Sequence, residues 1–245
     1  MKYTALIFST FFLLQTNHLL SQNKSLKIDY YYPKDSSLFN KNVTDFDFNY
    51  EKDLYGKTTM IIHCESAWGD FEFVFKKKIN KLTHYGGDSV NVYDGGKVVR
   101  KDYNQPYTIS EHNLYAFVLV HDHGGTLEKI KFQDFGNEVY QPEFDYTFCS
   151  ISDEDKDGKP EFYLCYMGES DGLDAKPFKQ IIYTFPVAGN TTAMVKSKAT
   201  AYYPAGNEED VYKAAYDANW NLLPAVVQLK SKNILKAHKM KRMKK

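Results

Sequence analysis

Hydrophobic and polar positions alternate with a period of two over most of this chain, a pattern typical of half-buried β-strands. In residues 71–76, for example, phenylalanine occupies every second position. Runs of this kind recur roughly every 10 to 20 residues, with no helical period between them. The pattern predicts an all-β fold of mainly antiparallel sheets, arranged as a sandwich or a small propeller, rather than βαβ units.

Turn-forming residues between these runs predict where the chain reverses. Asp94-Gly95-Gly96 separates two short β-branched runs and is a typical hairpin turn. Residues 115–120 are apolar on both faces, which favours a central strand. Residues 34–56 are turn-rich and are expected to form a connector with at most one strand. The predicted strands cover residues 27–32, 58–65, 71–75, 90–93, 97–100, 115–120, 129–132, 144–151, 162–167, 178–185 and 191–203.

The pattern changes to a helical period only after Pro224, which suits a helix start. Val226, Val227, Ile234, Leu235 and His238 recur at helical spacing and predict one helix of about four turns. The last sixteen residues contain eight Lys or Arg and no acid. This end is predicted to be either a solvated tail or a contact for anionic glycan or lipid head groups.

The two ends divide the chain into a signal peptide over 1–22, a β-rich domain over 23–223 and a C-terminal helix with a basic tail over 224–245. The basic start and the short apolar run at residues 5–14 are typical of a signal peptide, with cleavage near Ser21 or Gln22. The first cysteine is Cys64, so a lipid-anchored form is not expected. We expect an exported protein, periplasmic or at the cell surface, without a membrane span.

The composition of the chain limits which classes of molecule it is expected to bind. The chain carries 31 basic and 31 acidic residues, and this zero net charge disfavours a nucleic-acid binder, which needs a basic surface. Aromatic residues make up 16% of the chain. They predict either a β-rich core or an exposed set of tyrosines that stack on sugar rings, so a glycan or a cell-surface protein is the expected partner.

The strongest local motif is the acidic stretch 153–161. Carboxylates at alternate positions, a glycine sixth and a carboxylate ninth match the needs of Ca²⁺, which takes six to eight oxygen ligands. The predicted metal ligands are the side chains of Asp153, Asp155 and Asp157, the carbonyl of Lys159 and the side chain of Glu161. Gly158 is expected to supply the sharp bend. The alternative is a surface acidic loop without metal.

The flanks of this EF-hand-like loop favour strands over helices. Leu164 stands where an EF-hand has its twelfth ligand and has no oxygen to donate. The loop therefore closes a predicted hairpin over 146–167, and it resembles the β-hairpin calcium loops of FG-GAP and integrin-type propeller blades. That resemblance implies a structural role for the ion.

A wider resemblance covers residues 146–183. The run Asp-Lys-Asp-Gly-x-x-Glu-Phe-Tyr, the acidic segment 168–174 and the segment 177–183 are similar to a group of small exported bacterial proteins, loosely labelled surface polysaccharide biosynthesis proteins. The resemblance implies a cell-surface glycan context and no particular mechanism. Glu169, Asp171 and Asp174 are expected either to complete the calcium shell, to bind a second ion, or to form a plain polar turn.

Three further features have competing interpretations. Cys149 and Cys165 flank the loop symmetrically and predict either a disulfide or two buried thiols. His121 and His123 are two residues apart and predict either a zinc site or a tight turn. No catalytic motif occurs. We therefore expect a calcium-stabilised, non-catalytic binding or structural module, with an enzyme acting on surface polysaccharide and a periplasmic inhibitor or protein-partner module as alternatives.

Overall fold

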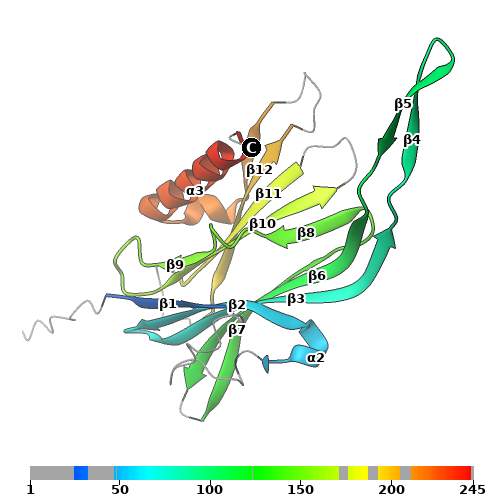
Figure 1. Ribbon diagram of the computed structural model, residues 1–245. Coiled ribbons are helices and arrows are strands. Elements are labelled where there is room, and N and C mark those ends of the chain that lie inside the picture. Colours follow the sequence, from blue (N-terminus) through cyan, green and yellow to red (C-terminus); the bar gives the residue numbers. More distant parts are fainter. Residues whose placement is uncertain are drawn as a thin grey trace, which may run out of the picture.

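The computed structural model describes residues 25–32, 47, 49–122, 124–170, 176–186, 193–204 and 211–243. These residues form two antiparallel sheets, a C-terminal helix and a projecting two-stranded arm (Figure 1). The predicted all-β fold with a C-terminal helix is confirmed. The predicted signal peptide lies outside the described residues.

The first sheet has the strand order β1-β2-β3-β6-β7. Two tight hairpins build most of it, because β2 reverses into β3 and β6 reverses into β7. β6 lies between β3 and β7, so the predicted central strand is confirmed. The strands are β1 (Lys27–Tyr31), β2 (Lys57–Ser66), β3 (Gly69–Tyr85), β6 (Tyr107–Asp122) and β7 (Gly125–Phe135).

The second sheet has the order β13-β12-β11-β10-β8, and β9 pairs with the other part of β10. The prediction of one continuous strand over 144–151 is wrong. The backbone turns after Phe144, where Phe148 N donates to Asp145 O at 2.9 Å, and pairing with β10 resumes only at Ser150. The strands are β8 (Tyr140–Phe144), β9 (Ser150–Ser152), β10 (Glu161–Ser170), β11 (Lys176–Thr184), β12 (Val195–Tyr203) and β13 (Lys213–Tyr216).

The two sheets pack face to face through aromatic side chains, so the architecture is a sandwich and the propeller alternative is wrong. Phe71 and Phe73 of β3 each contact Phe162 of β10 with ring centroids 5.6 Å apart. Phe75 meets Phe144 of β8 edge to face at 5.1 Å. The alternation of β3 explains this contact, because every second side chain of a strand points to the same face of its sheet.

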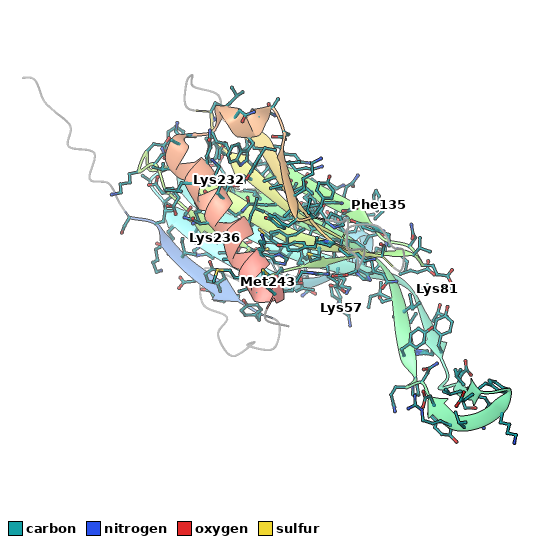
Figure 2. The ribbon with its side chains drawn as sticks, turned by 90° about the horizontal axis from the view of Figure 1, so that it is seen from above. Lys57, Lys81, Phe135, Lys232, Lys236 and Met243 are labelled. Atoms are coloured by element: carbon teal, nitrogen blue, oxygen red, sulfur yellow. The ribbon has the colours of Figure 1, made fainter. Side chains whose placement is uncertain are left out.

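Helix α3 (Ala225–Met243) covers the outer face of the second sheet, as Figures 1 and 2 show. Its buried residues are Val227, Ser231, Leu235 and His238, whereas Val226, predicted to share the apolar spacing, is 45% exposed. His238 stacks on Phe178 of β11 with centroids 3.7 Å apart. Among the described helices, none has the length and apolarity needed to cross a membrane.

The basic residues of α3 meet acids of the second sheet and its loops. Lys230 Nζ lies 2.9 Å from Glu154 Oε1, Lys241 Nζ lies 3.0 Å from Asp145 Oδ2, and Arg242 reaches Glu169 at 3.6 Å. Helix α3 continues to Met243 with Lys232, Lys236 and Lys241 exposed, so the basic end is a solvated helix rather than a frayed tail as far as that residue. The alternative contact with anionic glycan or lipid head groups stays a prediction.

The outer face of the first sheet is partly covered by the segment before β2. Tyr50 and Tyr55 place their rings 5.5 and 5.0 Å from Phe117 of β6. Tyr55 ends the short helix α2 (Lys52–Tyr55), and a 3₁₀ turn η2 (Asn219–Leu222) precedes α3. The sequence predicted only one helix and missed these two short helical elements. The strand considered within 34–56 falls mostly outside the described residues.

An arm projects from the body where β3 and β6 run on together beyond the sandwich (Figures 1 and 2). It ends in the hairpin of β4 (Ser89–Asp94) and β5 (Lys97–Tyr103), whose predicted turn at residues 94–96 is confirmed. Large apolar side chains of the arm are exposed rather than packed: Ile79, Leu82, Val90, Tyr93, Val98, Val99, Tyr103 and Tyr107.

Candidate functional site

The acidic stretch closes a β-hairpin. β9 and β10 are antiparallel, with Ser152 opposite Glu161, so residues 153–160 form the loop between them. Strands lie on both sides of the loop, as its flanking residues predict. Gly158 has φ +82°, a left-handed conformation that glycine adopts without steric cost, and its amide donates to Asp153 Oδ2 at 3.1 Å. The predicted role of Gly158 as the bend is confirmed.

Three carboxylates converge inside this loop. Asp153, Asp155 and Glu161 each offer one oxygen, and these oxygens lie within 4.8 Å of one another. Glu161 is 4% exposed and accepts hydrogen bonds from Ser152 Oγ at 2.8 Å and from the amide of Glu154 at 3.0 Å. Asp153 Oδ1 is buried and has no hydrogen-bond partner. The group therefore contains one buried carboxylate oxygen that no protein donor satisfies.

Without a cation, the ionised forms of these three carboxylates repel one another. Burial raises the pKa of Glu161 to about 7, and the neighbouring Asp155 and Asp153 charges act in the same direction. Burial also raises the pKa of Asp155. A divalent cation among them would reverse this preference, because it stabilises the ionised carboxylates.

The other two predicted ligands are placed differently. Asp157 lies outside the three-carboxylate group, and its Oδ1 accepts from the amide of Lys159 at 2.8 Å. The ammonium group of Lys159 lies 3.4 Å from Asp157 Oδ2 and 4.7 Å from the ring centroid of Trp68. Of the four predicted side-chain ligands, the structure thus brings three together and turns the fourth toward Lys159.

The loop lies beside the beginning of α3. A small cavity is lined by Asp155 and Glu161 on the loop side and by Pro224 and Val227 on the helix side. Lys230 of α3 contacts Glu154 and places its ammonium group 4.8 Å from the ring centroid of Tyr163 on β10. The loop and the first turns of α3 are therefore in direct contact.

The three cysteines are buried free thiols, so the predicted alternative of a disulfide between Cys149 and Cys165 is wrong. The turn that interrupts 144–151 carries Cys149 out of the strand ladder. Its Sγ lies 3.4 Å from the carbonyl oxygen of Cys165 and accepts from the Cys165 amide at 3.3 Å. Burial raises the pKa of the Cys149 thiol to about 12, which keeps it protonated and unreactive.

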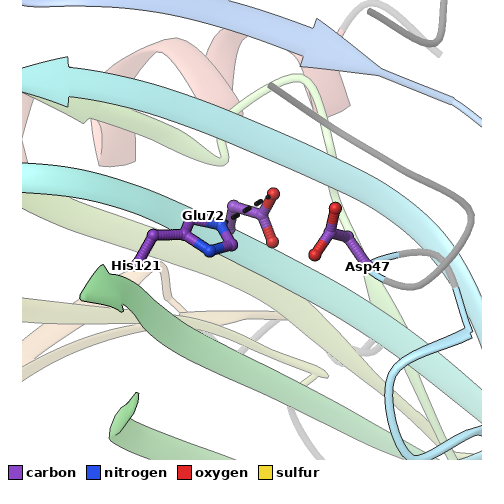
Figure 3. Close-up of side chains that lie close together, drawn as sticks. All are labelled: Asp47, Glu72 and His121. Carbon is purple, nitrogen blue, oxygen red and sulfur yellow. Dashed lines mark ion pairs between the residues drawn. The ribbon is translucent and has the colours of Figure 1, made fainter. Parts of the chain in front are cut away.

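A second group of polar side chains lies on the outer face of the first sheet. His121 of β6 contacts Glu72 of β3, and Asp47 approaches both from the segment before α2 (Figure 3). The sequence indicated His121 only through its spacing from His123, which lies outside the described residues. The pairing of β3 with β6 brings Glu72 to His121, and the packing of the segment before α2 brings Asp47. No local sequence pattern indicates either neighbour.

The remaining acidic candidates do not join the carboxylates of the 153–161 loop within the described residues. Glu169 reaches Arg242 of α3 at 3.6 Å, and Asp171 and Asp174 lie outside the described part of the chain. Comparison with known proteins adds nothing to this geometry: no family model, no curated protein and no solved structure matches the chain.

Proposed function

We propose that this protein is an exported, non-catalytic binding module of the cell surface whose hairpin 153–161 is closed by Ca²⁺. The observation that carries the metal assignment is the convergence of Asp153, Asp155 and Glu161, together with the unpartnered buried oxygen of Asp153. All the donors are oxygens, the ligand type that a hard cation prefers. A dissociation constant of about 10⁻⁴ to 10⁻³ M is expected, as in other extracellular calcium modules.

The ion would raise the stability of the folded protein. It would neutralise three carboxylates that repel one another and would fix β9 against β10 at the end where the loop meets α3. Side-chain oxygens of Asp157 or the carbonyl of Lys159 would complete the shell after a local rearrangement. Any ion that binds only the folded chain raises its stability by mass action.

Asp155→Ala is expected to abolish the calcium-dependent rise in melting temperature that the unmodified protein shows. The variant removes one of the three converging carboxylates, so the remaining shell binds calcium too weakly to add stability. Melting curves in EDTA and in millimolar calcium measure this difference. Asp94→Ala in the arm turn is the matched control and keeps the calcium response. An unmodified protein that melts at the same temperature in both conditions contradicts the calcium assignment.

The arm is the best-supported ligand surface. A two-stranded hairpin is marginal by itself, and exposed apolar patches mark interaction sites. Tyr93 and Tyr103 are 63% and 71% exposed, and Tyr85 and Tyr107 stack on each other at 4.8 Å at the outer end of the β3–β6 pair. Tyrosine faces suit sugar rings, since the ring is apolar and the hydroxyl can hydrogen-bond. The zero net charge and the resemblance over residues 146–183 also support a surface glycan as the ligand.

Replacing Tyr93 and Tyr103 by Ala together is expected to remove glycan binding without changing the melting temperature. Both side chains are exposed and contribute little packing, so their loss acts on the ligand surface alone. A glycan array followed by titration of the best sugar measures the effect. Tyr202→Ala, an exposed tyrosine of the body, is the control. Turnover of a polysaccharide would instead favour an enzyme, and a stable complex with one protein, without glycan binding, would favour a protein-partner module.

A further inference from the structure

The outer face of the first sheet holds a row of ionisable side chains in an otherwise apolar surface. Glu72 of β3 lies opposite His63 of β2 and Leu119 of β6, and Asp70 lies opposite His121. These side chains point to the same face as Ile61 and Phe117, which are fully buried. A charged row at such positions is costly unless a specific partner compensates it.

Glu72 is at the centre of this row. Its side chain is fully buried, and its Oε1 lies 3.2 Å from Nε2 of His121. Asp47, which is 4% exposed, offers an oxygen within 4.8 Å of the other two ligand atoms. Figure 3 shows the Glu72 carboxylate between the imidazole of His121 and the carboxylate of Asp47. Side chains from two strands and from the covering segment thus meet at one point.

The carboxylate of Glu72 has no hydrogen-bond donor in the structure. Neither carboxylate oxygen of Glu72 has a hydrogen-bond partner, and Nε2 of His121 approaches Oε1 without hydrogen-bond geometry. Buried polar atoms are satisfied in most proteins, so an orphaned carboxylate points to a missing ligand. A cation would supply that ligand and would stabilise the ionised carboxylate.

We propose that Asp47, Glu72 and His121 bind a divalent transition-metal ion of the zinc class. One imidazole nitrogen and two carboxylate oxygens suit Zn²⁺ better than Ca²⁺, which prefers six to eight oxygens. Two ligands at about 2.1 Å from a tetrahedral zinc lie about 3.4 Å apart, close to the 3.2 Å between His121 Nε2 and Glu72 Oε1. The site is separate from the calcium hairpin, which lies on the second sheet.

The site has a route to solvent. The side chain of His121 is 31% exposed, and a surface hollow beside it is lined by Trp68, Asp70 and Asp122. His63 lies outside the group of Asp47, Glu72 and His121, and its Nε2 lies 2.5 Å from Asp70 Oδ1. Three protein ligands therefore remain, and the fourth position of the metal is left for water or an incoming ligand.

Metal binding is tested with protein that carries no polyhistidine tag, stripped of metal and kept in millimolar calcium to saturate the hairpin. Titration with Zn²⁺ is expected to give one ion per chain, and Co²⁺ is expected to give the visible absorption of a four- or five-coordinate ion. Glu72→Gln and His121→Gln should each weaken binding at least about 100-fold. His84→Gln, at an exposed histidine of the arm, should leave it unchanged.

The melting temperature of Glu72→Gln separates a metal ligand from a structural ion pair. Without zinc, the variant should melt no lower than the unmodified protein, because the amide replaces a buried carboxyl of the same shape without its charge. With zinc, only the unmodified protein should gain stability. The proposal is overturned if zinc fails to bind stoichiometrically, if both ligand variants bind it normally, or if Glu72→Gln lowers the melting temperature equally with and without zinc.

Discussion

Phe162→Ala is expected to lower the free energy of unfolding by about 3 to 5 kcal/mol. Phe162 is fully buried between the two sheets, where its ring contacts Phe71 and Phe73 at 5.6 Å each. The change removes the apolar area of the ring and leaves a cavity that the stiff β-sandwich can fill only in part. Equilibrium unfolding in urea measures the loss.

Phe135→Ala is the matched control for this variant. Phe135 ends β7 and is 55% exposed, so its removal should change the free energy of unfolding by less than about 0.5 kcal/mol. A loss below about 1 kcal/mol for Phe162→Ala would mean that the sheets are not held together through this ring. The calcium-dependent rise in melting temperature should survive in Phe162→Ala if the variant folds, because no ligand oxygen is removed.

Glu161 should make metal-free protein less stable as the pH rises from about 4.5 to about 7, by about 3 kcal/mol. Burial raises the pKa of this carboxyl from 4.5 to about 7, so in this range the folded chain holds a proton that the unfolded chain has released. The stabilisation is complete below pH 4.5 and is lost as the pH passes through the folded-state pKa.

Glu161→Gln isolates this effect, since other carboxyl groups also titrate in the range. The amide cannot ionise, so the difference in unfolding free energy between the two proteins should change with pH by the predicted amount in EDTA. Glu138→Gln, at an exposed acid, is the control. Millimolar calcium should reduce the loss in the unmodified protein, because the ion binds the ionised carboxylate. A difference that stays constant between pH 4.5 and 7 would contradict the burial of an ionisable Glu161.

The two proposed metal sites differ in how far apart their ligands lie in the sequence. The ligands of the calcium hairpin lie within nine consecutive residues, and their spacing is set by the loop alone. The ligands Asp47, Glu72 and His121 are separated by long stretches of sequence and meet only after β3 and β6 pair and the segment before α2 packs on them. The first site can therefore form with one hairpin, whereas the second requires the pairing of β3 with β6 and the packing of the segment before α2 on them.

The sequence by itself determined most of the strands, though not β13, most of the hairpins, the C-terminal helix and three of the four acidic side chains that were expected to converge at the loop. These features depend on interactions between residues near one another in the chain: alternation along a strand, turn chemistry at Asp94 and Gly158, and helical spacing after Pro224. The tertiary structure decided the break between β8 and β9, the free thiols, the sandwich in place of a propeller, and the meeting of Glu72 with His121. Periodicity specifies which face a side chain occupies, but strand register and sheet packing specify its neighbours, because those contacts join residues distant in sequence.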